Sequence, residues 1–361
     1  MPEHKALLVR ALGGARGEVG LRNTPSPGPG QVLVRNVAVA LNPADAYMHK
    51  FGLFLTEDTL PATLGFDGAG EVAELGPGVG GWNLGISFYE GVVAKADQQT
   101  FQEYTIVNAK LMSKVPPNIT IEQAATIPAG FMAAALGIYV PKKDEVRPDG
   151  FDFGGVGLHP LWLDGGLGKY TGQAALVVGG ASSVGQYALQ LLAASGFSPL
   201  LTTASKHNEA YCKAAGATHV IDYKEVPYAE LPAKIREILQ VESEEKSLAF
   251  IYDAACKDGS QEAAFSLLAP GGLMVTAQAS TVGVRGKDDE LGRRVIAPYG
   301  LPNEHEEFST PMCASLTELF AKGVLKPNNV KLVDGGLAGI PDALDSLLSK
   351  GVSGYKLVVR L

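Results

Sequence analysis

The chain has 361 residues, of which 46% are hydrophobic and 19% are charged, and 44 of them are glycine. This length exceeds what one hydrophobic core organises, so we expect two domains of a globular protein of the α/β type. The formal net charge of -8 excludes the basic surface that binds nucleic acid or an anionic membrane.

The sequence also argues against export and membrane insertion. The N-terminal residues carry Glu3 and Lys5 beside only a short apolar run, so they lack the apolar core of a secretory signal. The longest apolar stretch, residues 124–140, is interrupted by Pro128 and Gly130 and is typical of a buried helix. The three cysteines are far apart and form no C-x-x-C pair, which favours a reducing compartment over disulfides or a thiolate zinc site. We therefore expect a cytoplasmic protein.

The first third of the chain consists of short apolar runs separated by glycine and proline. Such runs predict strands, and their spacing is typical of a mostly antiparallel, barrel-like domain. The expected strands are residues 5–10, 31–41, 68–75, 85–93 and 101–107.

From about residue 131 the pattern changes to alternating strands and helices. This alternation predicts a doubly wound parallel sheet. The expected strands are 174–179, 198–203, 219–222, 248–252 and 272–277, and the expected helices are 183–195, 208–215 (closed by Gly216), 232–241 and 261–268.

Two further segments stand outside this alternation. Residues 141–172 are rich in glycine and show no period, which is typical of a functional lid or contact arm. After about residue 300 the elements are mixed, and the chain ends in an expected strand at 355–359. That strand lies far beyond the parallel sheet, so we expect it to rejoin the first domain and make that domain discontinuous.

A glycine-rich turn, V-V-G-G-A-S-S-V-G, follows the strand at 174–179 and precedes the helix at 183–195. Gly179 and Gly180 permit a tight turn whose N–H groups point at an anion, beside the positive end of the helix. Gly185 allows the helix to pack closely on the strand. Ser182 stands where the usual G-x-G-x-x-G fingerprint has its middle glycine, and it adds a hydroxyl donor for a phosphate oxygen. We predict that this loop binds a dinucleotide.

The end of the next strand indicates which dinucleotide is bound. It reads Thr-Thr-Ala-Ser-Lys at 202–206 and contains no carboxylate to hold the ribose of NAD. Ala204 leaves room for a 2′-phosphate, and Ser205 and Lys206 supply a hydroxyl and a charge to bind it, so we expect NADPH. The alternative is that Lys206 is a solvated residue that opens the next helix. Tyr223 is expected near the adenine.

Several segments together make the chain similar to the medium-chain dehydrogenase/reductase superfamily. They are P-G-P-G-Q-V-L-V at 27–34, N-P-A-D-A-Y at 42–47, L-G-F-D-G-A-G-E-V at 64–72, A-A-T-I-P-A-G at 124–130, V-G-G-A-S-S-V-G-Q at 178–186, G-A-T-H-V-I-D-Y at 216–223 and G-Y-K-L-V-V at 354–359. The resemblance implies a GroES-like β-barrel catalytic domain formed by residues 1–130 and 301–361. It also implies a Rossmann NADPH-binding domain at 131–300, with the active site in the cleft.

The resemblance also bears on metal binding. The zinc alcohol dehydrogenases carry a cysteine near the position of Asn42 to Asp45 and a G-H-E motif where this chain has Gly-Phe-Asp at 65–67. Phe66 cannot ligate zinc and no cysteine precedes Cys212, so we expect no metal site. This leaves the zinc-free branches, whose quinone oxidoreductases have the N-P-x-D-x-Y seen at 42–47. Fungal trans-acting enoyl reductases resemble the chain at the glycine loop and at 203–208 but carry lysine in place of Tyr47.

These observations predict an NADPH-dependent, zinc-independent reductase that transfers hydride to an activated C=C bond of an enone, enal or enoyl thioester. One alternative is an NADPH quinone or carbonyl reductase of the same superfamily, and another is a non-catalytic NADPH-binding scaffold. The expected partner is a small-molecule substrate, with neither nucleic acid nor membrane. The chain is expected as a monomer or homodimer, and the resemblance suggests a polyketide synthase as a protein partner.

The catalytic candidates are Tyr47 and Asn42. Without zinc, the oxyanion that develops on the substrate needs hydrogen-bond donors, and Tyr47 is the proposed donor or proton source. Its alternative role is to pack its ring against nicotinamide or substrate. Asn42 either orients the substrate or caps a turn before Pro43.

Four further assignments complete the candidate site. Asp67 is expected to bond to backbone, and His49 to lie at the surface or rim. Lys356 matches the terminal motif of the family and is expected near the cofactor, with an exposed lysine as the alternative. The cofactor-binding candidates are Gly179, Gly180, Ser182, Ser183, Val184, Gly185, Thr203, Ser205, Lys206, Tyr223 and Lys356.

Overall fold

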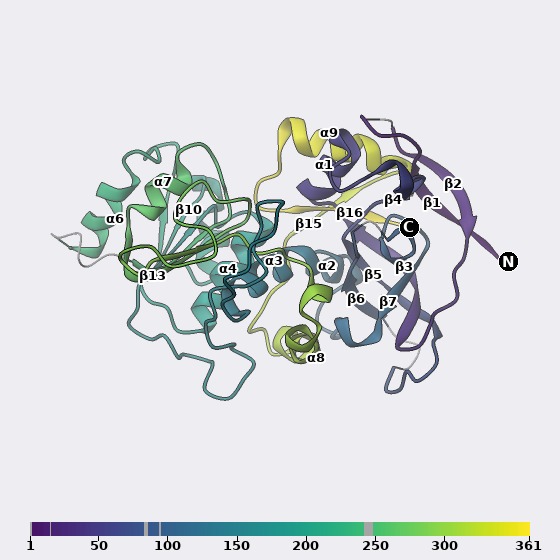
Figure 1. The fold of residues 1–361 in the computed structure, drawn as a ribbon, viewed down its shortest axis with the longest axis horizontal. Coiled ribbons are helices and arrows are strands. Elements are labelled where there is room, and N and C mark those ends of the chain that lie inside the picture. Colours follow the sequence, from purple (N-terminus) through teal and green to yellow (C-terminus); the bar gives the residue numbers. More distant parts are fainter. Residues whose placement is uncertain (1, 15, 83–85, 94, 242–247) are drawn as a thin grey trace. The chain divides into compact units, whose positions relative to one another are not determined.

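The computed structural model describes residues 2–14, 16–82, 86–93, 95–241 and 248–361. The chain folds into two compact units, whose elements are drawn in Figure 1. The first unit joins Met1–Ala129 to Leu301–Leu361, and the second is Gly130–Gly300. The division between the units falls between residues 129 and 130 and between residues 300 and 301.

The first unit is built on a seven-stranded sheet with the order β15-β16-β3-β5-β6-β8, in which β7 also pairs with β3. A three-stranded sheet with the order β2-β1-β4 stands beside it in the same unit. The strands are β1 (Glu3–Val9), β2 (Glu18–Asn23), β3 (Gln31–Ala40), β4 (Ala62–Thr63), β5 (Asp67–Leu75), β6 (Ile86–Glu90), β7 (Tyr104–Asn108), β8 (Met112–Lys114), β15 (Val330–Val333) and β16 (Lys356–Arg360).

The last strand, β16, pairs antiparallel with β3 and parallel with β15, as the prediction of a discontinuous first unit requires. Helices α1 and α9 pack against each other over this unit (Figure 1). The helices of the unit are α1 (Pro43–Phe51), α2 (Ile121–Ala125), α8 (Glu306–Ala321) and α9 (Ile340–Lys350), and the chain enters the second unit within α3 (Pro128–Tyr139).

The second unit is a six-stranded parallel sheet with the order β11-β10-β9-β12-β13-β14. The central strands are buried along their length, which explains why they read as continuous apolar runs in the sequence. The elements are β9 (Ala175–Val178), α4 (Ser183–Ala194), β10 (Leu200–Thr203), α5 (Glu209–Ala214), β11 (His219–Ile221), α6 (Leu231–Leu239), β12 (Leu248–Asp253), α7 (Ser260–Phe265), β13 (Leu268–Thr276) and β14 (Arg294–Ile296).

Short 3-10 helices connect several of these elements in both units. They are η1 (Glu57–Thr59), η2 (Ala96–Gln98), η3 (Ala109–Leu111), η4 (Lys206–Asn208), η5 (Pro302–His305) and η6 (Gly336–Gly339).

Some predicted elements differ from the structure. The helix predicted at 261–268 ends at Phe265, because Leu268 already pairs with Leu248 as the start of β13. The strand predicted at 101–107 begins only at Tyr104, after a turn closed by the Gln102 N–H and the Thr100 carbonyl. The strand predicted at 85–93 runs over Ile86–Glu90, and residue 85 lies outside the described residues. Helices α1, α8 and α9 and several short strands were not predicted.

Residues 141–172 contain neither helix nor extended strand, and they are packed onto the second unit. Asp152 joins the segment to Ala297 through a backbone bond of 2.7 Å and a side-chain bond of 2.8 Å. Near the end of the segment, the Tyr170 ring stacks on Phe197 with ring centroids 5.0 Å apart. Contacts from Asp152 and Tyr170 thus hold the segment in place although it lacks regular structure.

Within the described ranges, no helix combines the length and the apolar character that a bilayer crossing requires.

Candidate active site

The glycine loop of the second unit has the geometry of an anion cradle. Gly179, at φ 80°, turns the chain at the end of β9, and its N–H donates to the Thr203 side chain at 2.9 Å. The Gly180 N–H donates to the Thr203 carbonyl at 3.0 Å, which ties the loop to β10. Ser182 is the N-cap of α4, and its side-chain oxygen accepts the Gly185 N–H at 3.0 Å. The first-turn N–H groups of α4 lack partners within the helix, so the positive end of the helix faces the loop.

The three loop glycines stand where a side chain has no room. A Cβ at Gly179 would lie 2.9 Å from the Ala255 Cβ, and one at Gly180 would lie 2.1 Å from the Thr202 hydroxyl oxygen. A Cβ at Gly185 would lie 2.3 Å from the Gly179 carbonyl oxygen. This close backbone packing fits a loop that wraps a pyrophosphate with main-chain atoms, so the residues present fit a dinucleotide.

The other loop candidates occupy distinct places around the cradle. Ser182 is exposed, whereas Ser183 and Val184 are half-buried in the first turn of α4. The Ser183 hydroxyl oxygen would lie 2.4 Å from a Cβ at Gly130, so this side chain packs toward α3. Thr203 is fully buried beneath the loop and supports it through the bonds to Gly179 and Gly180.

The candidates at the end of β10 form a second polar group in the same unit. The buried Ser205 donates to the Tyr223 hydroxyl at 2.7 Å. The Lys206 side chain is 76% exposed, with its Nζ 3.9 Å from Glu225. Such an exposed pair contributes little, so the ammonium is available to another anion.

One acidic residue beside this group was missed in the sequence. Asp222 follows β11, and its carboxylate accepts the backbone N–H groups of Lys206 at 3.0 Å and of Lys224 at 2.9 Å. These backbone bonds lower the pKa of Asp222. The sequence signal for Asp222 was its position directly after β11, which runs parallel to β10. A carboxylate was expected only among the residues that follow β10 itself.

In the first unit, the candidates Asn42 and Lys356 converge on Asp67. The Asn42 amide donates to Asp67 Oδ2 at 2.8 Å, and Lys356 forms an ion pair with the same oxygen. The other carboxylate oxygen accepts the Ala129 N–H at 2.7 Å. Asp67 therefore bonds to backbone as predicted, but it also carries a buried ion pair. Lys356 is only 4% exposed, so the alternative of an exposed lysine is wrong.

Two more buried carboxyl groups belong to this cluster, and the sequence did not single them out. Asp45, fully buried, accepts the backbone N–H of Asn42 at 2.8 Å, and Glu90 pairs with Asp67 in the register of β5 and β6. Within the described part of the chain, Asp45 Oδ1 and Glu90 Oε2 have no hydrogen-bond partner. The N-P-A-D spacing at 42–45, with proline at the first helical position, was the available signal for Asp45.

The charges of this cluster do not balance when all its groups are ionised, because three carboxylates face one ammonium. Burial, reinforced by the charge of Asp67, raises the pKa of Asp45 to about 7. The same two causes raise the pKa of Glu90 well above its usual range. The raised pKa values of Asp45 and Glu90 favour their protonated, neutral forms, which offsets the lack of further positive charges in the cluster.

Helix α1 links this cluster to Tyr47. Asn42 is its N-cap, Pro43 opens it, and Gly52 ends it in the left-handed region at φ 70°. Tyr47 lies outside the cluster, 39% exposed, with its ring stacked on Phe51. Asn42 thus occupies the N-cap position of α1, and its side-chain amide contacts the Asp67 carboxylate.

His49 corrects the sequence prediction of a surface or rim residue. It is 4% exposed, and its Nε2 accepts the Gly17 N–H at 3.2 Å. Burial lowers the pKa of His49, which keeps the imidazole neutral as this acceptor role requires. Its position on the buried face of α1, one turn after Asp45, explains the difference.

The donor set around Asp67 does not fit a metal ion. Among the residues that the structure describes, no group of three or more His, Cys, Asp and Glu side chains is arranged to hold one. Both oxygens of Asp67 are already occupied by Asn42, Lys356 and Ala129, and a buried ammonium lies against the carboxylate.

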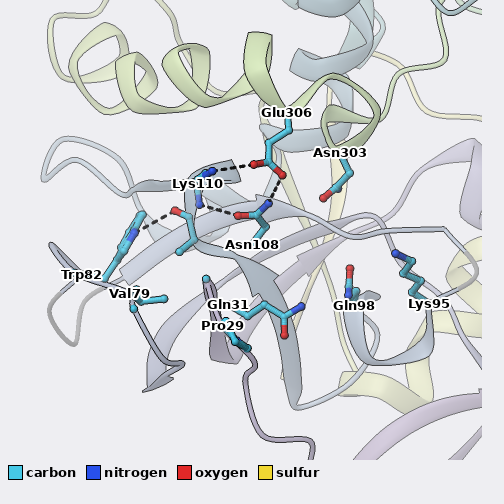
Figure 2. A pocket seen from close by; sticks show the side chains of 14 residues that line it. Pro29, Gln31, Val79, Trp82, Lys95, Gln98, Asn108, Lys110, Asn303 and Glu306 are labelled. Carbon is cyan, nitrogen blue, oxygen red and sulfur yellow. Dashed lines mark hydrogen bonds and ion pairs between the residues drawn. The ribbon is translucent and has the colours of Figure 1, made fainter.

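A separate depression of about 500 Å³ lies on the first unit, and Figure 2 shows the side chains around it. Its rim includes the ion pair between Lys110 and Glu306, at 3.0 Å, and Trp82, whose ring nitrogen donates to the Ala109 carbonyl at 3.1 Å. None of the candidate residues lines this depression.

The crowding at Gly185 leads to a first prediction. In Gly185→Ala, the added methyl group meets backbone atoms that cannot move aside, so we expect unfolding free energy to fall by about 1–3 kcal/mol. We also expect NADPH affinity, measured by fluorescence titration, to fall with it. The matched control is Gly80→Ala, where a Cβ meets nothing within 4 Å. Unchanged NADPH affinity in Gly185→Ala would contradict the prediction that this loop binds the dinucleotide.

The protonated cluster leads to a second prediction. Because the pKa of Asp45 is higher in the folded state than its ordinary 3.8, the folded state binds the proton more tightly, and stability falls as pH rises toward about 7. Asp45→Asn removes this dependence. Between pH 5 and pH 8, we expect the variant to gain about 2 kcal/mol of unfolding free energy relative to the wild type. Urea unfolding at both pH values measures this, with the exposed Asp58→Asn as a control that shows no such gain.

Comparisons with known proteins agree with this architecture. Residues 28–117 match the alcohol dehydrogenase GroES-like domain family, and residues 183–307 match the zinc-binding dehydrogenase family. The chain is 30% identical over 351 residues to the trans-enoyl reductase pvhC of Talaromyces variabilis, covering 92% of this chain and 90% of that protein. It is 28% identical over 354 residues to lovC, the enoyl reductase component of the lovastatin nonaketide synthase of Aspergillus terreus, covering 92% and 89%.

A solved structure shows the same fold. The quinone oxidoreductase of Pseudomonas syringae pv. Tomato DC3000 superposes with a TM-score of 0.73 at 22% identity, over 99% of this chain and all of that one. The chain therefore belongs to the medium-chain dehydrogenase/reductase superfamily and is an oxidoreductase related to the trans-enoyl reductases.

Proposed function

We propose that the protein is an NADPH-dependent reductase of activated C=C bonds, acting on an enone, enal or enoyl thioester without a metal. The observation that carries the proposal is the glycine-built cradle at the start of α4, in a chain whose relatives include trans-enoyl reductases. Similarity to lovC supports a polyketide synthase as the partner that presents the substrate.

The second unit would hold the cofactor at two places. The loop from Gly179 to Gly185 would bind the pyrophosphate at the positive N-terminal end of α4. Ser205 and Lys206 would bind a 2′-phosphate, since the Lys206 ammonium is exposed and only loosely paired with Glu225. Bound NADPH supplies the hydride.

The residues of the chain must stabilise the charge that conjugate reduction creates. As hydride reaches the β carbon, negative charge develops on the carbonyl oxygen, and a proton then reaches the α carbon. Tyr47 is the proposed hydrogen-bond donor to that oxygen, because it is partly exposed on a helix whose N-terminus is fixed by Asn42. In this proposal, Asn42 and Lys356 act by holding α1 against Asp67 and do not touch the substrate.

The second candidate function is quinone reduction, which the structural likeness to a quinone oxidoreductase favours. A substrate panel separates the two. Purified protein with NADPH should reduce 2-alkenals and enoyl thioesters faster than 1,2-naphthoquinone or simple aldehydes. Faster turnover of the quinone would replace the proposal by the second candidate, and NADPH binding without turnover of any substrate would favour a scaffold.

The cofactor preference depends on Lys206. In Lys206→Ala we expect the Michaelis constant for NADPH to rise about tenfold, which corresponds to about 1.4 kcal/mol for one charged contact, while that for NADH stays constant. Steady-state kinetics with both cofactors measure the change. Lys213→Ala, another exposed lysine of the same unit, serves as the control. An unaltered NADPH to NADH preference in Lys206→Ala would rule out this phosphate site.

The role of the Tyr47 hydroxyl is tested by Tyr47→Phe, which keeps the ring. Loss of a donor to the oxyanion should lower kcat on the order of 10²-fold with little effect on the Michaelis constant for NADPH. A kcat close to that of the wild type would show that only the ring matters, which is the packing alternative.

A further inference from the structure

Helix α1 has two unlike faces, and its exposed face is aromatic. Asp45, Ala46, Met48 and His49 are buried, which fixes the helix on the first unit. On the opposite side, Tyr47 and Phe51 are one turn apart and their rings stack, with centroids 6.1 Å apart and planes at 28°. Phe51 is 68% exposed. A stacked aromatic pair in this position presents an apolar surface to solvent.

The chain after α1 extends this surface in a constrained conformation. Gly52 ends the helix in the left-handed region, and Phe54 adopts φ 64°, a conformation that is unfavourable for a bulky side chain. Between them, Leu53 stays 41% exposed, while Leu55 is buried after the turn. Backbone strain of this kind persists only where the surrounding structure enforces it, and it is concentrated at ligand-binding segments. We call Tyr47, Phe51 and Leu53 the α1 apolar face.

The α1 apolar face is continuous with the proposed reacting group. Tyr47 is both its first member and the proposed donor to the substrate oxygen. A substrate whose carbonyl meets the Tyr47 hydroxyl therefore lies beside the Phe51 ring, and any long apolar extension of that substrate has this ring and Leu53 within reach.

We propose that the α1 apolar face binds the hydrocarbon chain of a medium or long enoyl thioester, so that Phe51 is a specificity-determining residue that favours long acyl chains over short ones. This inference rests on the proposed function. Burial of methylene groups against an aromatic ring and a leucine supplies the preference, because each apolar contact removes surface from water.

The test compares the 2-butenoyl and 2-decenoyl thioesters of N-acetylcysteamine with the full-length protein and NADPH. For the wild type, we expect the Michaelis constant of the decenoyl substrate to be lower than that of the butenoyl substrate. In Phe51→Ser, the ratio of decenoyl to butenoyl Michaelis constants should rise about tenfold, and Phe51→Tyr should restore the wild-type ratio. Leu332→Ser, at another exposed apolar position of the first unit, on β15, should leave the ratio unchanged.

The outcomes separate the two proposals. If the wild type reduces neither thioester but reduces a 2-alkenal, this inference alone fails; if it reduces none of these substrates, the proposed function fails as well. If it reduces both thioesters and Phe51→Ser keeps the wild-type ratio, the inference alone is overturned. A change in sedimentation coefficient in Phe51→Ser, with the ratio unchanged, would show that a second copy of the chain covers the face and would also overturn the inference. Because Phe51 is exposed, thermal unfolding should show that the variant is folded.

Discussion

One buried ion pair determines how the first unit is assembled. Lys356 comes from the last strand, β16, and Asp67 from the start of β5, and both side chains are excluded from water. Removing one partner of such a pair leaves an uncompensated buried charge, which costs about 3–5 kcal/mol. The same carboxylate receives the Asn42 amide at the start of α1 and the Ala129 N–H at the start of α3. Within this unit, Asn42 at the start of α1 and Ala129 at the start of α3 thus bond to the same carboxylate.

A different constraint acts in the second unit, where the backbone of the glycine loop packs closely against neighbouring atoms. Its glycine loop leaves no room for a Cβ at Gly180 or Gly185, and Thr203 fastens the loop to β10 from below. In the proposal, the second unit binds the cofactor at the N-terminal end of α4, whereas the first unit contributes side chains. This division suits a reductase in which one part holds a common cofactor and the other selects the substrate.

The sequence predicted the second unit better than the first for a physical reason. Strands such as β9 and β12 are buried on both faces and read as unbroken apolar runs, and Gly216, at φ 107°, closes a helix as expected. Helix α1 was missed because its exposed face is aromatic, so its apolar residues do not follow one helical stripe. The cluster around Asp67 is formed by residues from distant parts of the chain, so no local sequence pattern predicts it. The role of Tyr47 as hydrogen-bond donor to the substrate oxygen and the phosphate site at Lys206 remain predictions.

The place of β16 between β15 and β3 also bears on the order in which the protein is made. During synthesis, residues 130–300 leave the ribosome before β16 does, so the parallel sheet of the second unit can form first. Until β16 arrives, β3 has an open edge at residues 38–40, and Asp67 lacks its cation. An unpaired edge of this kind is a template for wrong pairing with other chains. The nascent protein therefore has an interval in which a chaperone has most to protect, and this interval ends when β16 has been made and pairs with β3.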